Sequence, residues 1–221
     1  MKVMILAAGR GQRMRELTER CPKPLLKIKG VSLIEHHIQA LKKQGFSEFV
    51  INIAYLGEQI KQALGSGEQW GVSIEYSDEA GSALETGGGI FKALPLLGDK
   101  HFLVVNADVW TDFSYASLRK QITSNIHLVL VNNPTHNLGG DFQLQRDRVV
   151  TQGGESLTYS GVGVFHPSVF SAETGGVFPL APLIRQQIAN AEVSGQLHNG
   201  VWVDVGTPER LAFLESQMLT Q

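Results

Sequence analysis

Residues with the chemistry of a phosphate site lie close to the N-terminus. An apolar segment over residues 2–8 predicts a buried strand, and it leads directly into Gly9-Arg10-Gly11-Gln12-Arg13. Glycines let backbone N–H groups approach a phosphate closely, and an arginine guanidinium pairs with two phosphate oxygens at once. We therefore predict that this loop binds phosphate, with Arg13 balancing the charge.

Two familiar phosphate motifs do not match this loop. A dinucleotide fingerprint requires a third glycine at position 14, which is Met14, and an acidic residue about 20 positions further on, where residues 27–30 have none. A Walker loop requires Gly-Lys followed by Ser or Thr, and no such run follows the glycines. The loop therefore belongs to neither class.

A lysine between two prolines follows the loop, in Pro22-Lys23-Pro24. Prolines restrict the backbone, so the lysine is held in place, and a preorganised ammonium stabilises charge on a transferring or leaving phosphate. The first 30 residues contain eight Lys and Arg against two Glu, a formal charge of +6, which also predicts an anion here. Taken alone, Lys23 also fits an exposed proline-rich turn.

Two aspartates stand near the ends of predicted strands that are far apart in the sequence. Asp108 follows the apolar segment 101–106, and Asp204 lies in Trp202-Val203-Asp204-Val205. Carboxylates from two strands that converge on one crevice can hold Mg²⁺, which binds a few protein oxygens together with substrate phosphates. Capping of a helix or turn is the alternative for either aspartate alone.

A second glycine run, Leu84-Glu85-Thr86-Gly87-Gly88-Gly89, stands at a predicted helix start, where a base or sugar can approach the backbone. Glu85 or Thr86 could hydrogen-bond a base edge there, and a flexible loop is the competing interpretation. Gly139-Gly140-Asp141 and Ser160-Gly161 are candidates for an opposite wall that contacts sugar hydroxyls. Turn formation explains both of these segments equally well.

Alternating strands and helices must position these groups. Ser32-Leu33-Ile34-Glu35 is a capping box that opens a helix, and Thr207-Pro208-Glu209 opens the last helix. The alternation predicts an α/β fold with a doubly wound, mostly parallel mixed sheet flanked by helices, and ligands beyond the carboxyl ends of the strands. Further predicted elements are strands at 49–53, 72–76 and 101–106, helices at 58–64, 87–94 and 113–122, and short antiparallel strands at 142–144, 149–151 and 157–165.

Composition limits the classes of function. With 221 residues, 43% hydrophobic and 18% charged, the sequence predicts one domain over residues 1–221 with a sizeable core. The single cysteine, Cys21, leaves no internal disulfide and suits the cytoplasm. No apolar run approaches the roughly 20 residues of a membrane helix. The net charge of −2 argues against a nucleic-acid partner, and we expect a monomer or a weak homo-oligomer.

Taken together, the motifs resemble the sugar-1-phosphate nucleotidyltransferases, and the resemblance covers nearly the whole chain. The matching segments are, in order, Leu6–Met14, Pro22-Lys23-Pro24-Leu25, Leu84–Gly89, Asn106-Ala107-Asp108 and Val203-Asp204. Within the family, the short length and the segments 84–95 and 106–112 are most similar to the uridylyltransferases of bacterial cell-wall recycling. Arg10 stands where many relatives have lysine, and Ser160 where some have asparagine.

This resemblance implies a Rossmann-like fold and a Mg²⁺-dependent reaction that joins UTP to a sugar 1-phosphate and releases pyrophosphate. The implied catalytic residues are Arg13, Lys23, Asp108 and Asp204, with both aspartates holding the metal. The implied nucleotide contacts are Ala8, Gly9, Gly11, Gln12, Arg13, Lys23, Glu85, Thr86 and Gly87. The implied sugar-phosphate contacts are Asn106, Gly140, Asp141 and Ser160.

Two alternatives stay open at the level of sequence. One is the same chemistry on another pair, such as GTP with mannose 1-phosphate or dTTP with glucose 1-phosphate, because Glu85 fits several base edges. The other is a non-catalytic nucleotide-sugar sensor on the same fold. The presence of Arg13, Lys23 and both aspartates argues against a sensor, which has no need of the full charged set.

Overall fold

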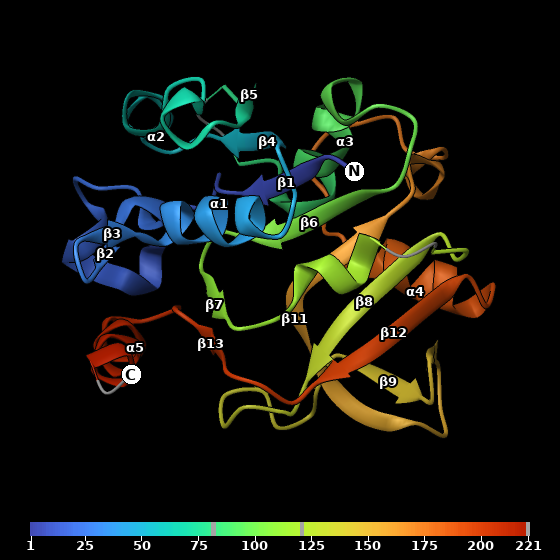
Figure 1. Ribbon diagram of the computed structural model, residues 1–221. Helices are drawn as coiled ribbons and strands as arrows, with labels where there is room; N and C mark the ends of the chain where they lie inside the picture. The colour runs from blue at the N-terminus through green and yellow to red at the C-terminus, as the bar shows by residue number, and fades with distance from the viewer. Residues whose placement is uncertain (81–82, 120–121, 220–221) are drawn as a thin grey trace.

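The computed structural model describes residues 1–80, 83–119 and 122–219, and nine of the strands in these ranges form one continuous sheet (Figure 1). Four neighbouring strands are parallel, in the order β5 (Ser73–Asp78), β4 (Glu48–Ile53), β1 (Val3–Leu6) and β6 (Phe102–Asn106). Because β4 and β6 lie on opposite sides of β1, the strand order reverses there, and a crevice opens beyond the strand ends.

The other half of the sheet is largely antiparallel. β11 (Glu155–Phe165) runs antiparallel to both β6 and β8 (Ile126–Val131), and β8 pairs in parallel with β12 (Val193–His198). Two short strands, β9 (Phe142–Gln145) and β10 (Arg148–Val150), complete this half. The antiparallel pairing predicted for the segments 142–144, 149–151 and 157–165 is confirmed.

Helices cover both faces of the sheet, which confirms the predicted doubly wound α/β fold. Side chains of α1 (Leu33–Lys43) and α2 (Gly57–Leu64) pack with one set of sheet residues, which includes Val3 and Ile5. The alternate residue, Met4, faces the other core. That second core contains side chains of α3 (Glu85–Leu97) and α4 (Ala181–Ala189).

Two small sheets attach both ends of the chain to the crevice. β7 (Val109–Thr111) pairs antiparallel with β13 (Trp202–Asp204), and β2 (Lys27–Ile28) pairs with β3 (Val31–Ser32). The last helix, α5 (Pro208–Leu219), packs through Leu214 against Met14 of the 3-10 segment η1 (Gln12–Thr18) and against Ile28. The N-terminal loop and the C-terminal segment therefore share one small core. Figure 1 shows α5 beside β2 and β3.

Helix boundaries differ from expectation in two places. The predicted stop at Pro95 is wrong, because α3 continues to Leu97 and also begins two residues early, at Glu85. Pro95 lies in the last turn, where the missing N–H removes a single helical hydrogen bond, and the buried Leu97 side chain offsets that loss. The helix predicted for 113–122 is a 3-10 segment, η4 (Tyr115–Arg119), and residues 120 and 121 lie outside the described residues.

The remaining predicted elements are present. The capping box is complete: the Glu35 N–H donates to Ser32 Oγ, and the Ser32 N–H donates to a Glu35 carboxylate oxygen. Thr207 Oγ1 accepts from the Arg210 N–H at the start of α5, as expected for an N-cap. Across the ranges that the structure describes, no helix combines the length and the apolar character needed to cross a membrane.

A buried histidine links α1 to the strand end that carries Asp108. His37 is 5% exposed, and its Nδ1 lies 3.5 Å from the Tyr115 hydroxyl. Burial lowers the pKa of His37 to about 4, against weaker opposing effects from a backbone hydrogen bond with Val109 and from Asp108, while His36 lowers it further. The folded chain therefore keeps this ring neutral at pH values where the unfolded chain binds a proton.

We predict that the free energy of unfolding falls as the pH is lowered from about 6.5 to about 4, because only the unfolded chain protonates His37 in that window. This one group accounts for up to about 3 kcal/mol. Urea unfolding at about pH 7.5 and about pH 4.5 measures the loss, which is smaller in His37→Gln than in the wild type. An equal loss in both proteins would contradict the prediction.

Candidate active site

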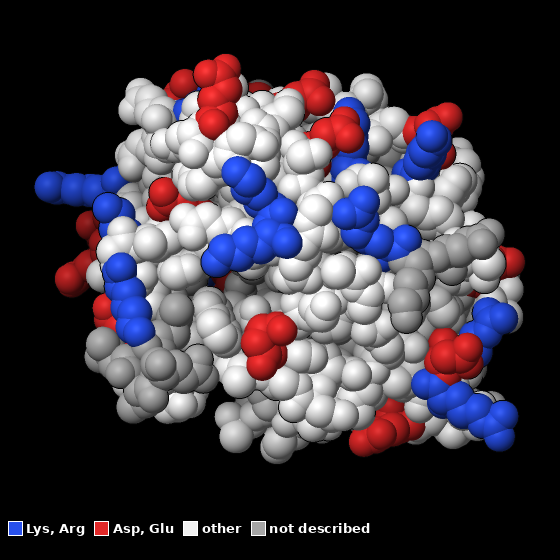
Figure 2. All heavy atoms as spheres, viewed as in Figure 1, with Lys and Arg blue, Asp and Glu red and all other residues white. Residues whose placement is uncertain are grey.

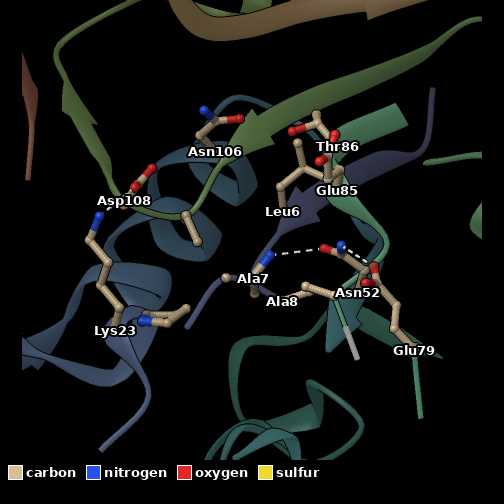
Figure 3. A pocket seen from close by; sticks show the side chains of 14 residues that line it. Leu6, Ala7, Ala8, Lys23, Asn52, Glu79, Glu85, Thr86, Asn106 and Asp108 are labelled. Atoms are coloured by element: carbon tan, nitrogen blue, oxygen red, sulfur yellow. Dashed lines mark hydrogen bonds and ion pairs between the residues drawn. The ribbon is translucent and has the colours of Figure 1, made fainter. Parts of the chain in front are cut away.

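A cavity of about 210 Å³ lies beyond the carboxyl ends of β1, β4 and β6 (Figure 3). Its walls come from the loop after β1, the residues after β6 and the start of α3, which is where the fold predicts a ligand. The predicted site residues that line it are Ala8, Gly9, Lys23, Glu85, Thr86, Asn106 and Asp108. Segments more than 90 residues apart in sequence thus converge as expected.

A second cavity adjoins the first. The two share Asn106 and Asp108, and the second is also lined by Arg13, Asp204 and Ser160, among others. All four predicted catalytic residues therefore line these two adjoining cavities. Asp108 is therefore open to ligands in either cavity.

An ion pair stands at this junction. Lys23 Nζ lies 2.5 Å from Asp108 Oδ2, and Figure 3 shows the two side chains pointing toward each other. Lys23 is 7% exposed and belongs to the 3-10 segment η2 (Lys23–Leu25), between the prolines that hold its backbone. The side chain is therefore preorganised, as predicted. Gly11 leaves room for it: a Cβ there would lie 3.1 Å from the Lys23 Cβ, and the φ of +66° suits glycine.

The β7–β13 pairing places the second aspartate beside the first. Asp204 is opposite Val109 in the register, and the Val205 N–H donates to the Asp108 carbonyl oxygen at 2.8 Å. Asp204 Oδ2 also accepts from Arg210 Nη1 at 2.7 Å and lies 3.5 Å from His136 Nε2. Sequence reasoning missed Arg210. Its place in the first turn of α5, just after the strand carrying Asp204, was the available signal.

This donor set fits Mg²⁺. No cluster of three or more Asp, Glu, His and Cys side chains able to hold a metal occurs within the described ranges. A fully protein-made cage is therefore not formed by these residues. Asp108 and Asp204 provide two carboxylates that line one cavity, and Mg²⁺ is commonly bound by one or two carboxylates together with substrate phosphates.

Two buried polar residues that sequence reasoning missed line the other end of the first cavity. Asn52 and Glu79 are each 3% exposed, and Asn52 Nδ2 donates to Glu79 Oε1 at 2.7 Å. Figure 3 shows this pair away from Lys23, near Glu85 and Thr86. The available signal was a single amide within the buried, otherwise apolar run 49–53 of β4 and an acid directly after β5.

Several predicted contact residues lie elsewhere or are already engaged. Gln12 is exposed outside both cavities. Gly87 is buried under Phe178, where a Cβ would come within 2.5 Å of the ring, so packing accounts for this glycine. Gly140 lines a separate cavity that includes Arg185. These placements separate the three from the two-cavity junction.

Asp141 and Ser160, two further predicted sugar contacts, line the second cavity. Their side chains also form hydrogen bonds with backbone groups nearby. Asp141 accepts from the Tyr159 N–H at 2.8 Å and from Asn137 Nδ2 at 3.0 Å. The Ser160 hydroxyl donates to the Val129 carbonyl oxygen at 2.7 Å, inside an irregularity of β11. The Ser160 hydroxyl is thus committed to the sheet.

Surface charge agrees with the balanced composition. On the face shown in Figure 2, Lys and Arg side chains are interspersed with Asp and Glu and do not form one continuous basic surface. This pattern suits a net charge of −2 and a small anionic ligand held in a cavity.

A family model described as nucleotidyl transferase matches residues 2–137. The chain belongs to the nucleotidyl transferase family. This nucleotidyl transferase is 51% identical, over 96% of its own length and 95% of the relative's, to the N-acetylmuramate alpha-1-phosphate uridylyltransferase of Neisseria meningitidis serogroup B. It is 34% identical to the protein of the same name in Caulobacter vibrioides, over 97% and 96% of the two chains.

A solved structure supports the fold of this nucleotidyl transferase. A putative glucose-1-phosphate thymidylyltransferase from Bacillus anthracis, in complex with a sucrose, matches with a TM-score of 0.87 at 19% identity. The match covers 98% of this chain and 94% of that one. The resemblance to sugar-1-phosphate nucleotidyltransferases drawn from the sequence motifs is confirmed.

We predict that Asp108→Ala lowers the free energy of unfolding by about 1–3 kcal/mol, because the buried Lys23 ammonium loses its carboxylate partner. Adding Lys23→Met to that variant removes the unpaired charge and restores part of the loss. Urea denaturation of the two single variants and the double variant measures both effects.

The matched control is Asp112→Ala. Its carboxylate pairs with His198 at 2.9 Å but is 48% exposed, so its removal costs less than about 1 kcal/mol. A double variant less stable than Asp108→Ala alone would contradict the assigned ion pair.

Proposed function

We propose that this nucleotidyl transferase joins UTP to N-acetylmuramic acid α-1-phosphate, forming UDP-N-acetylmuramic acid and pyrophosphate. One structural observation carries the proposal: two cavities share Asp108, with its partner Lys23 on the first and Arg13 and Asp204 on the second. The 51% identical relative of that activity supports the choice of substrates. We further propose that the reaction serves cell-wall recycling in the cytoplasm.

In the proposed reaction an oxygen of the sugar phosphate attacks the α-phosphorus of UTP. A new phosphorus–oxygen bond forms, the bond to the oxygen bridging to the β-phosphorus breaks, and pyrophosphate leaves with that electron pair. The attacking oxygen is already anionic, so no general base is required. Positioning and charge stabilisation therefore supply most of the rate.

The charged residues of the two cavities have different roles in the proposed reaction. Lys23 lines the first cavity and would balance charge on the reacting phosphates, and Arg13 lies on the wall of the second cavity. Asp108 and Asp204 would hold Mg²⁺, which when bound neutralises charge on the reacting and leaving phosphate oxygens. A Cβ at Gly9 would meet no atom within 4 Å, so a ligand phosphate has room to approach the loop backbone there.

The far end of the first cavity suits a base with an N–H between two carbonyl groups. Glu79 presents a carboxylate, an acceptor that matches the N3–H of uracil. The first turn of α3 has no side-chain cap, and the Gly88 N–H there donates to the Phe178 carbonyl oxygen. The N–H groups of Glu85 and Thr86, which line the cavity, can donate to the uracil carbonyl oxygens. Cytosine has an acceptor at N3, which a carboxylate repels, so this end disfavours CTP.

Mg²⁺-dependent pyrophosphate release over a grid of nucleotides and sugar 1-phosphates tests the proposal. UTP, dTTP, GTP and CTP are each combined with the 1-phosphates of N-acetylmuramic acid, N-acetylglucosamine, glucose and mannose. The expected result is highest activity with UTP and N-acetylmuramic acid α-1-phosphate. Preference for another pair would overturn the substrate assignment, and no turnover with any pair by folded protein would favour a sensor.

We predict that Asp108→Asn and Asp204→Asn each lower kcat by about a thousandfold or more, because each removes a carboxylate proposed to hold the metal. Chelation of divalent cations stops the wild-type reaction, and added Mg²⁺ restores it. Asp112→Asn, a change outside both cavities, serves as the control. Near-normal turnover in either of the two test variants would contradict the proposed metal site.

A further inference from the structure

One buried amide side chain lines the first cavity, the cavity proposed to bind the nucleotide. Asn52 lies near the end of β4, opposite Leu6 of β1 in the sheet register and opposite Ser77 of β5. It is 3% exposed in a strand whose neighbouring side chains are apolar. Burying a polar amide in such a strand costs free energy unless all its groups find partners, so its contacts show what it is positioned to do.

Three hydrogen bonds form a relay through this side chain. The Ala7 N–H donates to Asn52 Oδ1 at 2.8 Å, and Asn52 Nδ2 donates to Glu79 Oε1 at 2.7 Å. The Leu84 N–H then donates to Glu79 Oε2 at 2.7 Å. The relay therefore connects Ala7, which follows β1, with the Glu79 carboxylate and with Leu84, the residue before α3.

Few side chains can serve at position 52. The site needs an acceptor on one side and a donor on the other, which an amide supplies and which a carboxylate or an apolar side chain of similar size does not. The helix above leaves room for the pair through Gly89, whose Cβ would lie 2.6 Å from Glu79 Oε1 and 2.9 Å from Asn52 Nδ2. This close approach explains the third glycine of the run 87–89.

We propose that Asn52 is a positioning residue that fixes the Glu79 carboxylate for base recognition and ties it to the start of the phosphate loop. This inference rests on the proposed function, in which Glu79 faces the base. Each oxygen of Glu79 accepts one protein hydrogen bond, so the carboxylate plane is fixed while further lone pairs stay available to a ligand. Base selectivity therefore depends on a residue proposed to act through Glu79.

The donor and acceptor pattern allows a test in which the amide and the carboxylate are swapped between positions 52 and 79. In Asn52→Asp, two carboxylates face each other and repel or share a proton. In Glu79→Gln, both Asn52 Nδ2 and the Leu84 N–H point at the new side chain, so its NH₂ group meets a donor in either orientation. In the double variant, the new amide donates to the new carboxylate and accepts from the Leu84 N–H, and the Ala7 N–H keeps an acceptor.

Dissociation constants for UTP and CTP, measured by calorimetry without the sugar, and kcat/KM for both nucleotides are the readouts. We expect each single variant to lose about tenfold in the preference for UTP over CTP. The double variant binds UTP about threefold or more tightly than either single variant, because the relay is complete again. Thermal unfolding confirms that each variant folds.

Ser77→Ala is the matched control, because Ser77 is a buried polar residue beside Asn52 on the next strand and outside the cavity. It leaves the UTP to CTP ratio unchanged. A proportional loss for both nucleotides in Asn52→Asp would overturn the positioning role. A double variant that binds UTP no more tightly than the tighter of the two single variants would overturn it as well. Absence of UTP binding by the wild type would instead refute the proposed function itself.

Discussion

The parallel pairing of β1 with β4 on one side and β6 on the other determines where the polar groups of both cavities lie. In the register, Leu6 is level with Asn52 on one neighbour and with Asn106 on the other, so two amides flank the last residue of β1. The loops that follow β1 and β6 then leave the same edge of the sheet. Since the strand order reverses at β1, these loops diverge and leave the crevice that the two cavities occupy.

Charge is the second constraint on this site. Lys23 is almost fully buried, and a buried ammonium requires a partner. The end of β6 supplies it through Asp108, and the β7–β13 pairing then brings Asp204 with its own partner, Arg210. Each carboxylate proposed to hold the metal is therefore balanced by one cation in the protein, and the small core around α5 and η1 keeps these charged segments together.

Features encoded by one short, continuous segment were the ones that the sequence predicted best. The strand and glycine loop before Arg13, the lysine between prolines and the capping box of Ser32 are local patterns, so they could be predicted without knowing the tertiary contacts. The doubly wound arrangement followed from alternation of elements. The places of Asp108 and Asp204 near strand ends suggested that the two converge, and the motif resemblance supported this prediction.

The missed features depend on pairs of residues that are distant in sequence. Nothing near Asn52 identifies Glu79 as its partner, and nothing near Gly87 indicates that Phe178 packs on it. The extension of α3 past Pro95 has the same cause, because tertiary burial of Leu97 outweighs a local signal that stops helices. Glycine was the most ambiguous residue type, since phosphate approach, packing and left-handed turns all select it.

The Lys23–Asp108 pair also explains how the site can be both stable and reactive. Before substrates bind, the ion pair lets each buried charge satisfy the other, so the fold does not carry an uncompensated ammonium. In the proposed reaction, Lys23 would pair with phosphate oxygens, and Asp108 would then be one of the residues that hold the metal. Each charge would therefore exchange one partner for another and would not be left unpaired in the buried site. Charged groups that are held in place before substrates bind can stabilise charge in the transition state at little cost in reorganisation.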